Sequence, residues 1–533
     1  MFKDFKSIAI TLLMVGALYH STANADIEHA GQLSEDEIWD NSDTHLVTGD
    51  IYIPSGITLT ISSGAMIKFA ALSDSNNLGT DASLSELIAD GGTLIIEGSS
   101  ADKVILTSDA DTPAAGDWRG IRVINGGELS LRHAEIRYAV TGVDYVQDGE
   151  VTRSPVIEDN VFEQLSSNGI YLESQGGAQI TLSIARNSMS NLGHRGVYLN
   201  STNANTLVQG LIEDNSITST GLNGVYFYAN SQARHDLTLS GNTIQITGSA
   251  ATNDNDRAGL WLSHSYSGST ISDYDINSNE VSASASYGFY VYHWFANVNL
   301  MLLGNSIHDN ANDGIYSYGY YLTANLSLAH NSVYANAGNG IRLSDRNVKR
   351  VTDINATLVL NDVYQNTGNG VNLYLGRPAH VVHNSIHENG GRGVHLDLTQ
   401  SSYVNFNNLY GNDSSDGIAL YNNGAAAVDA RYNWWGDTLS AEIATGDNPT
   451  NLTGIYDVYD DSAKGSVNYS DWLDEVQSEP LPTDPVSWVK SPSDGLVIKA
   501  ASYQIDGSAS SLSEIDRVEV STDGGITWEL ATG

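Results

Sequence analysis

The sequence predicts an all-β protein whose chain winds into a parallel β-helix, also called a β-solenoid. The main observation is a repeat in which an Asn precedes an aliphatic residue and, further on, a Gly and alternating apolar residues, as in NSVYANAGNGIRL. The intervals between the repeat Asn residues, from Asn160 to Asn433, average about 27 residues, within the range of repeat architectures. The composition agrees, because 51 Gly and 9 Pro residues among 533 suit many short strands joined by tight turns.

Each repeat is predicted to form one coil of three short strands. Its apolar residues alternate with polar ones, and no helical period of 3.6 residues is present. Successive coils would lie about 4.8 Å apart and pair in parallel. The repeat Asn is predicted to form a hydrogen-bonded side-chain ladder at a turn, and the repeat Gly to turn the backbone with a positive φ. The repeat Asn residues are Asn160, Asn187, Asn215, Asn242, Asn279, Asn305, Asn331, Asn361, Asn384, Asn407 and Asn433. The repeat Gly residues are Gly169, Gly196, Gly224, Gly259, Gly288, Gly314, Gly340, Gly370, Gly393 and Gly417.

These repeats resemble those of the right-handed parallel β-helix proteins of the pectate-lyase-like superfamily. Ahead of them, LVTGDIYIPSGITLTISSGAMIKF and GDWRGIRV resemble the first coils of exported bacterial members, and after them YNWWGDTLSAEI and NYSDWL resemble the closing coil. The resemblance covers roughly residues 40–475 and implies a right-handed helix. It implies no single activity, because the superfamily includes lyases, glycosidases, epimerases and adhesins.

The chain is predicted to divide into five parts. Residues 1–25 have the form of a signal peptide that is cleaved after Ala25, so the mature protein is expected to be secreted, extracellular or on the cell surface. Residues 26–125 are expected to form an N-terminal cap and the first coils, 126–475 the β-helix, and 476–487 a Pro-rich linker. Residues 488–533, with a hairpin signal at 523–525, resemble the first half of an Ig-like domain of bacterial surface proteins. This segment is shorter than the roughly 100 residues of such a domain, so the natural chain is expected to continue.

Charge and residue types argue against several classes of function. The formal net charge of −39 disfavours nucleic acid as a partner. The mature chain has no run of about 18 apolar residues that would predict insertion into a membrane. The absence of Cys excludes a thiol nucleophile and a Cys₄ zinc site. An acidic polysaccharide would be repelled unless cations or a local basic patch intervene.

Two columns of outward-pointing residues follow the repeat Gly, because strand side chains alternate between the two faces of a sheet. Sugar rings stack on exposed aromatic faces, so the columns predict a surface for an extended glycan, with a polysaccharide as the expected partner. The alternative is that the rings stack on one another. The first column reads Tyr171, Tyr198, Tyr226, Trp261, Tyr290, Tyr316, Arg342, Asn372, His395 and Ala419. The second column reads Glu173, Asn200, Tyr228, Ser263, Tyr292, Tyr318, Ser344, Tyr374, Asp397 and Tyr421, with Trp294 two residues after Tyr292. The residues predicted to bind substrate are Tyr228, Trp261, Tyr290, Tyr292, Trp294, Tyr316, Arg346, Asn372 and Tyr374.

A basic patch adjoins the C-terminal end of the first column and suits β-elimination on a uronate polysaccharide. Arg342 would neutralise the uronate carboxylate, and His395 or Tyr318 would remove the C5 proton. Lys349 and Asp397 are further catalytic candidates. The alternative is a solvated basic loop that pairs with nearby acids. The patch consists of Arg342, Arg346, Lys349, Arg350, Arg377, His380, His383, His387, Arg392 and His395.

Other chemistries have weaker signals. Hydrolysis would need two carboxylates facing one glycosidic bond, and Asp397 and Asp345 are the nearest candidates. The sequence has neither the paired-Asp motif of pectin hydrolases nor the DPHE motif of alginate epimerases. Residues 253–256 are expected to form a plain polar loop, with oxygen ligands for Ca²⁺ as the alternative, and no other cofactor is indicated.

Two functions therefore stay open from the sequence. The aromatic column that runs into a basic patch favours an extracellular glycan-binding protein, for which polysaccharide lyase activity is an additional option. The missing catalytic motifs favour a non-catalytic surface or adhesion protein, in which the solenoid is a spacer or a binding stalk.

Overall fold

The computed structural model describes residues 26–320, 322–345, 352–412, 415, 417–446, 448–477, 486–491, 506–510, 517–521 and 527–531. The signal peptide, residues 478–485 of the linker and the turn at 523–525 lie outside the described residues. So do three members of the basic patch, Arg346, Lys349 and Arg350.

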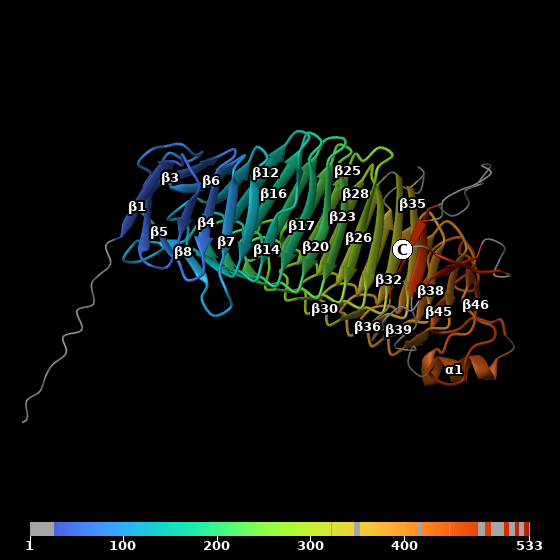
Figure 1. The fold of residues 1–533 in the computed structure, drawn as a ribbon. Helices are drawn as coiled ribbons and strands as arrows, with labels where there is room; N and C mark the ends of the chain where they lie inside the picture. Colours follow the sequence, from blue (N-terminus) through green and yellow to red (C-terminus); the bar gives the residue numbers. More distant parts are fainter. Residues whose placement is uncertain are drawn as a thin grey trace, which may run out of the picture.

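The chain winds into coils of three strands, as the repeat predicts. One coil consists of β15 (Val161–Leu165), β16 (Ile170–Gln175) and β17 (Gln179–Ala185), and each of these strands pairs in parallel with its equivalents in the neighbouring coils. The pairing produces three long sheets, here called sheets 1, 2 and 3 in the order in which a coil visits them. Their strands lie side by side along the solenoid (Figure 1), which confirms the predicted parallel β-helix.

The remaining strands of the three sheets repeat this arrangement. Sheet 1 also contains β5 (Met66–Phe69), β8 (Val104–Ser108), β11 (Ala134–Arg137), β18 (Ser188–Leu192), β21 (Ser216–Thr220), β24 (Thr243–Gln245), β27 (Glu280–Ser282), β30 (Ser306–His308), β33 (Ser332–Tyr334), β36 (Asp362–Tyr364), β39 (Ser385–His387) and β42 (Asn408–Tyr410). Sheet 2 also contains β6 (Glu86–Asp90), β9 (Gly120–Ile124), β12 (Val143–Asp148), β19 (Val197–Thr202), β22 (Val225–Asn230), β25 (Leu260–Ser265), β28 (Phe289–Trp294), β31 (Ile315–Tyr320), β34 (Ile341–Asp345), β37 (Val371–Leu375), β40 (Val394–Leu398), β43 (Leu420–Asn422) and β45 (Ile455–Tyr456). Sheet 3 also contains β2 (Glu37–Trp39), β4 (Thr58–Ser62), β7 (Thr93–Glu97), β10 (Glu128–Arg132), β13 (Thr152–Arg153), β14 (Val156–Glu158), β20 (Leu207–Glu213), β23 (Arg234–Ser240), β26 (Ile271–Asn277), β29 (Asn297–Leu303), β32 (Leu322–Ala329), β35 (Thr352–Val359), β38 (Ala379–Val382), β41 (Ser402–Asn405), β44 (Val428–Asp429) and β46 (Val467–Asn468).

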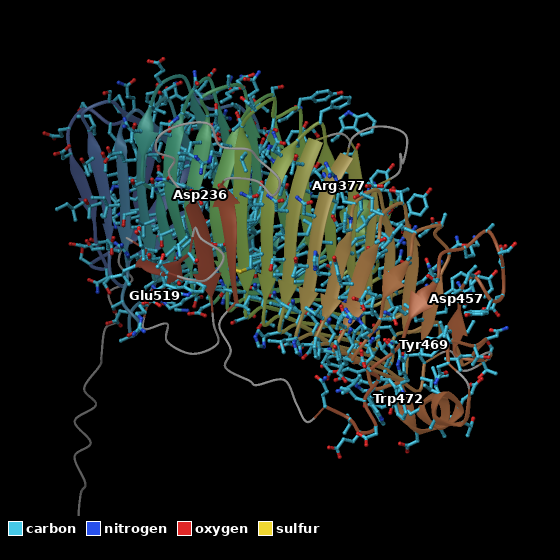
Figure 2. All side chains as sticks on the ribbon, turned by 90° about the vertical axis from the view of Figure 1, so that its right-hand side faces the viewer. Asp236, Arg377, Asp457, Tyr469, Trp472 and Glu519 are labelled. Atoms are coloured by element: carbon cyan, nitrogen blue, oxygen red, sulfur yellow. The ribbon has the colours of Figure 1, made fainter. Side chains whose placement is uncertain are left out.

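The two ends of the solenoid are closed by different elements. At the N-terminal end, β1 (Ile27–Gln32) pairs with β3 (Thr44–Pro54), whose two halves pair with β5 and β6 and so join sheets 1 and 2. At the C-terminal end, α1 (Gly436–Thr445) contributes Leu439 and Ile443 to the core. Tyr469 and Trp472 lie at this end of the solenoid (Figure 2).

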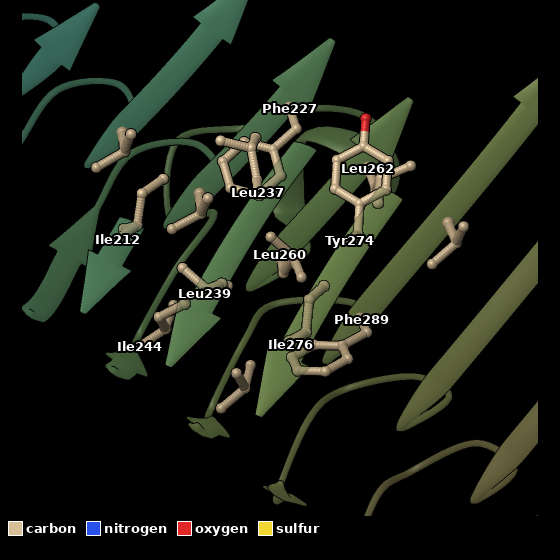
Figure 3. Close-up of a cluster of buried hydrophobic side chains, with 14 of the residues drawn as sticks. Ile212, Phe227, Leu237, Leu239, Ile244, Leu260, Leu262, Tyr274, Ile276 and Phe289 are labelled. Carbon is tan, nitrogen blue, oxygen red and sulfur yellow. The ribbon is translucent and has the colours of Figure 1, made fainter. Parts of the chain in front are cut away.

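The interior is one continuous hydrophobic core. Aliphatic side chains from all three sheets point inward in every coil, and Ile170 and Leu172 are 0% and 2% exposed, as the alternation predicts. Larger rings fill the middle coils, where Phe227 of sheet 2 and Tyr274 of sheet 3 stack at 6.1 Å (Figure 3). Because every coil adds similar side chains to the same core, stability accumulates along the axis.

The repeat Asn residues form the predicted ladder without interruption from Asn160 to Asn433. Each side-chain Nδ2 donates a hydrogen bond of 2.9–3.0 Å to the Oδ1 of the Asn in the next coil. The residue before each Asn has a φ of 53–64°, in the left-handed region. This turn directs the side-chain amide of the Asn into the wall of the solenoid. These Asn side chains are buried, and the ladder satisfies polar groups that have no access to water.

The prediction that the repeat Gly has a positive φ is wrong for nine of its ten positions. Among these glycines only Gly417 has a positive φ. The others are required by close packing against the next coil: a Cβ on Gly196 would lie 2.5 Å from Cγ2 of Ile217, and one on Gly224 would lie 2.3 Å from Cγ2 of Ile244. The backbone turn instead falls on the residue before the repeat Asn.

A second Asn ladder was not predicted from the sequence. Its members follow the repeat Asn by five residues and are bonded Nδ2 to Oδ1 at 2.9 Å. The signal is visible as Asn-x₄-Asn in five consecutive repeats, so the second ladder stiffens only the C-terminal coils. It consists of Asn310, Asn336, Asn366, Asn389 and Asn412.

Beyond the solenoid, the described residues form two short antiparallel pairs. β47 (Val486–Ser491) pairs with β48 (Asp506–Ser510), and β49 (Glu519–Val520) pairs with β50 (Glu529–Leu530). Antiparallel pairs are compatible with a β-sandwich, and the Ig-like identity of this segment stays a prediction.

Asn215→Ala is expected to destabilise the solenoid by about 1–3 kcal/mol for each buried partner left without a hydrogen bond. Asn215 donates to Asn242 and to the Ile184 carbonyl, and it accepts from Asn187. Urea unfolding measures the loss. Asn325→Ala is the matched control, because Asn325 makes similar amide bonds to Asn299 and Asn355 but on the partly exposed outer face. Equal losses in the two variants would contradict the importance assigned to the interior ladder.

Three interior histidines predict that stability falls with acid. Burial lowers the pKa of His235 and His264 to about 3 and that of His293 to about 4. The folded chain therefore keeps them neutral, whereas the unfolded chain binds protons below the usual pKa of about 6.5, so stability is lost as the pH falls from there. We expect the free energy of unfolding, measured with urea, to fall less between pH 7 and pH 4 in His293→Leu than in the wild type. Each protein is compared with its own value at pH 7. An unchanged pH dependence would mean that His293 does not resist protonation.

Candidate functional site

The candidate site is the outward face of sheet 2. Its strands pair in register, so that Tyr171 lies next to Tyr198 and Tyr290 next to Tyr316, and the order continues through Arg342. The second column follows the same register, two residues further along each strand. The two predicted columns are therefore rows of spatial neighbours from β16 to β40.

The last repeat is displaced by two residues from the predicted alignment. Tyr421 pairs with His395, so Tyr421 continues the first column in place of Ala419. Ala419 instead occupies the place of a repeat Gly, and its carbonyl accepts a hydrogen bond from Val394. Tyr456 extends the column further, with its ring 4.2 Å from that of Tyr421.

The aromatic rings of the first column stack mainly on one another. The ring centroids of Tyr198 and Tyr226 are 4.8 Å apart and those of Tyr226 and Trp261 are 4.2 Å apart, with nearly parallel planes. The stack continues with tilted rings through Tyr290 to Tyr316. Tyr226 and Tyr290 are each 7% exposed, so their faces are closed to a ligand. The sequence allowed two interpretations of this column, a surface for a glycan or rings that stack on one another, and the second describes the first column.

The second column offers rings that are more accessible. Tyr292 and Tyr318 lie with centroids 5.9 Å apart and planes 9° from parallel, and Trp294 lies 6.3 Å from Tyr292 at 20°. All three side chains are partly exposed. Further along, Tyr374 is 36% exposed. The smaller Ser263 and Ser344 separate these aromatic residues from their neighbours in the column.

A third row, here called the flanking column, borders the first one. It consists of the residue just before each repeat Gly, and it supplies several partners of the first column: Arg195 lies 4.9 Å from the Tyr226 ring, and Tyr287 lies 5.1 Å from the Tyr290 ring. This row was not predicted from the sequence, although each of its positions directly precedes a repeat Gly. Its members include Asn168, Arg195, Asn223, Tyr287, Asp313, Asn339, Asn369 and Arg392.

Arg342 is held between the first and the flanking columns. Its guanidinium lies 4.7 Å from the Tyr316 ring centroid and 3.7 Å from Oδ2 of Asp313. Burial raises the pKa of Asp313, although Asn339 donates two hydrogen bonds to its Oδ1, and burial also raises the pKa of Tyr287 to about 12. Arg342 is thus oriented by a buried carboxyl and a ring while its side chain stays 42% exposed.

His395 lies two strands from Arg342 in the first column, with Asn372 between them. Burial and the nearby Arg392 lower the pKa of His395 to about 4, so its imidazole is neutral near pH 7. The ring contacts Tyr421 edge-on at 5.0 Å, and its Nε2 is buried without a hydrogen-bond partner. Asp397, in the second column, accepts a hydrogen bond from Asn423.

Three other histidines of the described basic patch do not lie on this face, whereas Arg392 lies 3.5 Å from the Tyr421 ring at its edge. His387 belongs to sheet 1, where it stacks between Tyr364 and Tyr410. His380 belongs to sheet 3 and stacks on Tyr403, and His383 stacks on Phe406 at a turn. Residues close in sequence were distributed over three sheets because the chain changes face every few residues.

The structure also bears on two other candidate sites from the sequence. Asp345 points into the solenoid, is 1% exposed and accepts a hydrogen bond from the Gly376 amide, so it cannot face an external glycosidic bond. In the loop at 253–256, Asp256 pairs with Arg195 at 2.6 Å and Asp254 lies 3.9 Å from Arg257. The 3₁₀ turn η1 (Asn255–Arg257) is therefore tied to the flanking column, which favours the plain polar loop over a Ca²⁺ site.

Among the described residues, no group of three or more His, Asp or Glu side chains is arranged to hold a metal ion. No helix in that part of the chain is long and apolar enough to cross a membrane.

Comparisons with known proteins agree with this architecture. The family model for the pectate-lyase-like beta helix domain matches residues 31–145, and that for the right handed beta helix region matches residues 119–373 and 321–477. No curated protein sequence matches the chain.

The solved structures that match the chain are distant from it. The A-module of mannuronan C-5 epimerase AlgE4 from Azotobacter vinelandii is 15% identical, with 67% of this chain and 86% of that chain covered and a TM-score of 0.37. A mutant of the periplasmic alginate epimerase AlgG is 12% identical, with coverages of 75% and 76% and a TM-score of 0.30. Since the second family model spans more than half of the sequence, the chain belongs to the right-handed β-helix family.

Proposed function

We propose that the chain binds an extended polysaccharide along the outward face of sheet 2. The observation that carries this proposal is the near-parallel, partly exposed set of Tyr292, Tyr318 and Trp294 in the second column. Flat apolar rings with a polar tip suit sugar rings, which present both C–H faces and hydroxyl groups. The regular spacing of the coils would present such contacts repeatedly along one axis.

A second candidate function is β-elimination at the C-terminal end of the same face. Arg342 is partly exposed and would neutralise a uronate carboxylate, and the neutral imidazole of His395 or the phenolate of an ionised Tyr318 would accept the C5 proton. The released electron pair would form the C4=C5 double bond as the C4–O bond breaks, and the leaving oxygen would take a proton from water. Asp313 would orient Arg342, and Asn372, between Arg342 and His395, would contact the substrate. Arg346 and Lys349 remain candidates outside the described residues.

The non-catalytic alternative is a surface or adhesion protein that uses the solenoid as a spacer. The self-stacked first column supports a stiff rod, because its ring contacts stabilise the wall without a ligand. If the solenoid is a binding stalk, this alternative also includes contact with a glycan. Glycan binding and catalysis therefore have to be measured separately.

Tyr292→Ala and Tyr318→Ala are each expected to weaken polysaccharide binding about 3- to 10-fold, as loss of one aromatic contact of about 0.5–1.5 kcal/mol implies. Retardation in gels that contain alginate, pectate, ulvan or a neutral glucan measures the affinity. Tyr403→Ala is the matched control, because Tyr403 is 46% exposed and stacks on His380 but lies on sheet 3. Equal effects of all three substitutions would place the binding surface elsewhere.

If the chain is a lyase, it releases unsaturated product that absorbs at 235 nm from a uronate polysaccharide. Arg342→Ala and His395→Gln are then expected to lower the rate on the order of 10²-fold or more, and binding to change less than the rate. Above pH 5, protonation of His395 should not limit the rate, because its pKa is lowered to about 4. Binding without any absorbance at 235 nm, with and without Ca²⁺, would exclude the lyase and leave the binding proposal intact.

A further inference from the structure

A pocket of about 370 Å³ opens on sheet 3, in the coils that precede the first repeat Asn. Its walls come from β7, β10, β13 and β14, and Figure 1 shows β7 and β14 on the same side of the solenoid. The pocket shares no residue with the two columns of sheet 2. Ligand pockets typically measure about 300–1,000 Å³, so this one suits a small molecule.

The wall of the solenoid opens here because a proline interrupts one strand pairing. β10 pairs with β14 from Ser130 and Val156 onward, and by the same register Leu129 faces Pro155. Pro155 has no N–H group to donate, so the pairing cannot continue at that position. On the other side, both β13 and β14 pair with β17. The sheet is therefore continuous on one side of this coil and open on the other.

The floor of the pocket reaches the interior of the solenoid. Leu129 and Tyr145, which both belong to the hydrophobic core, line it. Tyr145 is 1% exposed, and among the described residues its hydroxyl has one hydrogen-bond partner, the Gly127 carbonyl at 3.5 Å. A buried tyrosine hydroxyl normally has a closer partner. Burial raises the pKa of Tyr145, so its hydroxyl keeps the proton and can donate it to a hydrogen bond with a ligand.

Arg153 borders the pocket with a guanidinium that the backbone already holds in place. Its Nε donates to the Gly126 carbonyl and its Nη1 to the Thr152 carbonyl, each at 2.7 Å. Glu128 lies 4.0 Å from Nε, and its side chain is 61% exposed, so this ion pair is largely screened by water. The two backbone bonds leave Nη2 of Arg153 as the nitrogen that can bind an anion.

Arg132 supplies a second guanidinium to the lining, but its charge is already matched. Its Nη1 donates to Glu97 and to the Ser130 hydroxyl, both at 3.1 Å, and its Nε lies 3.4 Å from Glu158. Two carboxylates therefore neutralise Arg132 and fix its orientation. Arg153 is the residue of this pocket that offers positive charge to a ligand.

The remaining lining combines hydroxyl groups with apolar side chains. Thr93, Thr152 and Ser154 carry hydroxyls, and Ile95 and Val156 are apolar. A ligand that matches this lining has hydroxyl groups, an apolar face and one negative charge. A sugar ring has hydroxyl groups and C–H faces, and a uronate adds the carboxylate.

We propose that this pocket binds a single uronate residue, either as a free uronic acid or at the end of a short oligosaccharide. The carboxylate binds Nη2 of Arg153. The ring hydroxyls form hydrogen bonds with Tyr145 and Thr93, and a C–H face of the ring packs against Leu129 and Ile95. No bond of the ligand is made or broken. The inference does not rest on the proposed glycan binding, because the pocket lies on a different sheet.

Isothermal titration calorimetry of the full chain tests the ligand class, with galacturonate, glucuronate, glucose and glutarate as probes. A dissociation constant of about 1 mM or below is expected for at least one of the two uronates, given their size. Glucose lacks the carboxylate and glutarate lacks the ring, so each is expected to bind at least about 10-fold more weakly. Trigalacturonate distinguishes the two forms of ligand: retained binding indicates a chain end, and lost binding indicates the free acid.

Two substitutions test the location. Arg153→Gln is expected to weaken uronate binding on the order of 10- to 100-fold, because a charged hydrogen bond is lost, and Tyr145→Phe about 3- to 10-fold. Tyr145→Phe should leave thermal unfolding near the wild type, since the hydroxyl has only a distant protein partner. Arg234→Gln is the matched control, because Arg234 also lies on sheet 3 but donates to Asp273 and to Asp236 (Figure 2).

Each contrary result has a separate meaning. Failure of both uronates to bind would overturn the inference. Uronate binding that survives Arg153→Gln and Tyr145→Phe but is lost in Tyr292→Ala would place the ligand on sheet 2, against the pocket and in favour of the proposed function. Glutarate binding as tight as that of the uronates would overturn the assignment to a sugar. Absence of polysaccharide retardation in gels would contradict the proposed function and leave this inference standing.

Discussion

The in-register stacking of coils is the constraint on which the rest of the structure depends. A coil can slip along its strands only if the buried amides of Asn160 through Asn433 break their hydrogen bonds, and each such group would then be left unsatisfied. The left-handed residue before each Asn fixes the direction of the amide, and the repeat Gly allows the next coil to approach closely. Register is therefore set by polar ladders, whereas the apolar core supplies most of the driving force.

Register in turn determines what the outer face can do. Because equivalent residues lie about 4.8 Å apart, aromatic rings at every coil of one column are brought within stacking distance whether or not a ligand is present. Tyr198, Tyr226 and Trp261 use their faces for one another. Where small residues interrupt the second column, as at Ser263 and Ser344, the rings of Tyr292 and Tyr318 between them stay partly exposed. A continuous aromatic ladder is thus a structural element, and an interrupted one is a better surface for a sugar chain.

The sequence predicts those features that depend on local periodicity. The strands, the Asn ladder and the neighbours within each column follow from the repeat alone, and the structure contains them. The position of Tyr421 could not be predicted, because a two-residue shift in the last coil depends on packing against β45 rather than on the motif. His380, His383 and His387 do not share a face with Arg342, because proximity in sequence does not mean proximity in a solenoid. Asp313 and the pocket of sheet 3 were missed for different reasons: Asp313 precedes the repeat Gly, and the pocket residues precede the repeats altogether.

The two mostly buried acids on the outward face of sheet 2 have a common physical origin. Asp144 of β12, which pairs with Tyr171, and Asp313 each lie where the stack of rings gives way to charged residues, and each has an Arg within 4 Å. The rings exclude water from these places, and burial raises the pKa of both carboxyls despite the neighbouring guanidinium groups. A carboxyl in such a place costs stability that a Tyr or an Asn at the same position would not cost. The ends of the stack are therefore the positions at which the sequence departs from what the stability of a solenoid requires, and such departures concentrate at functional sites.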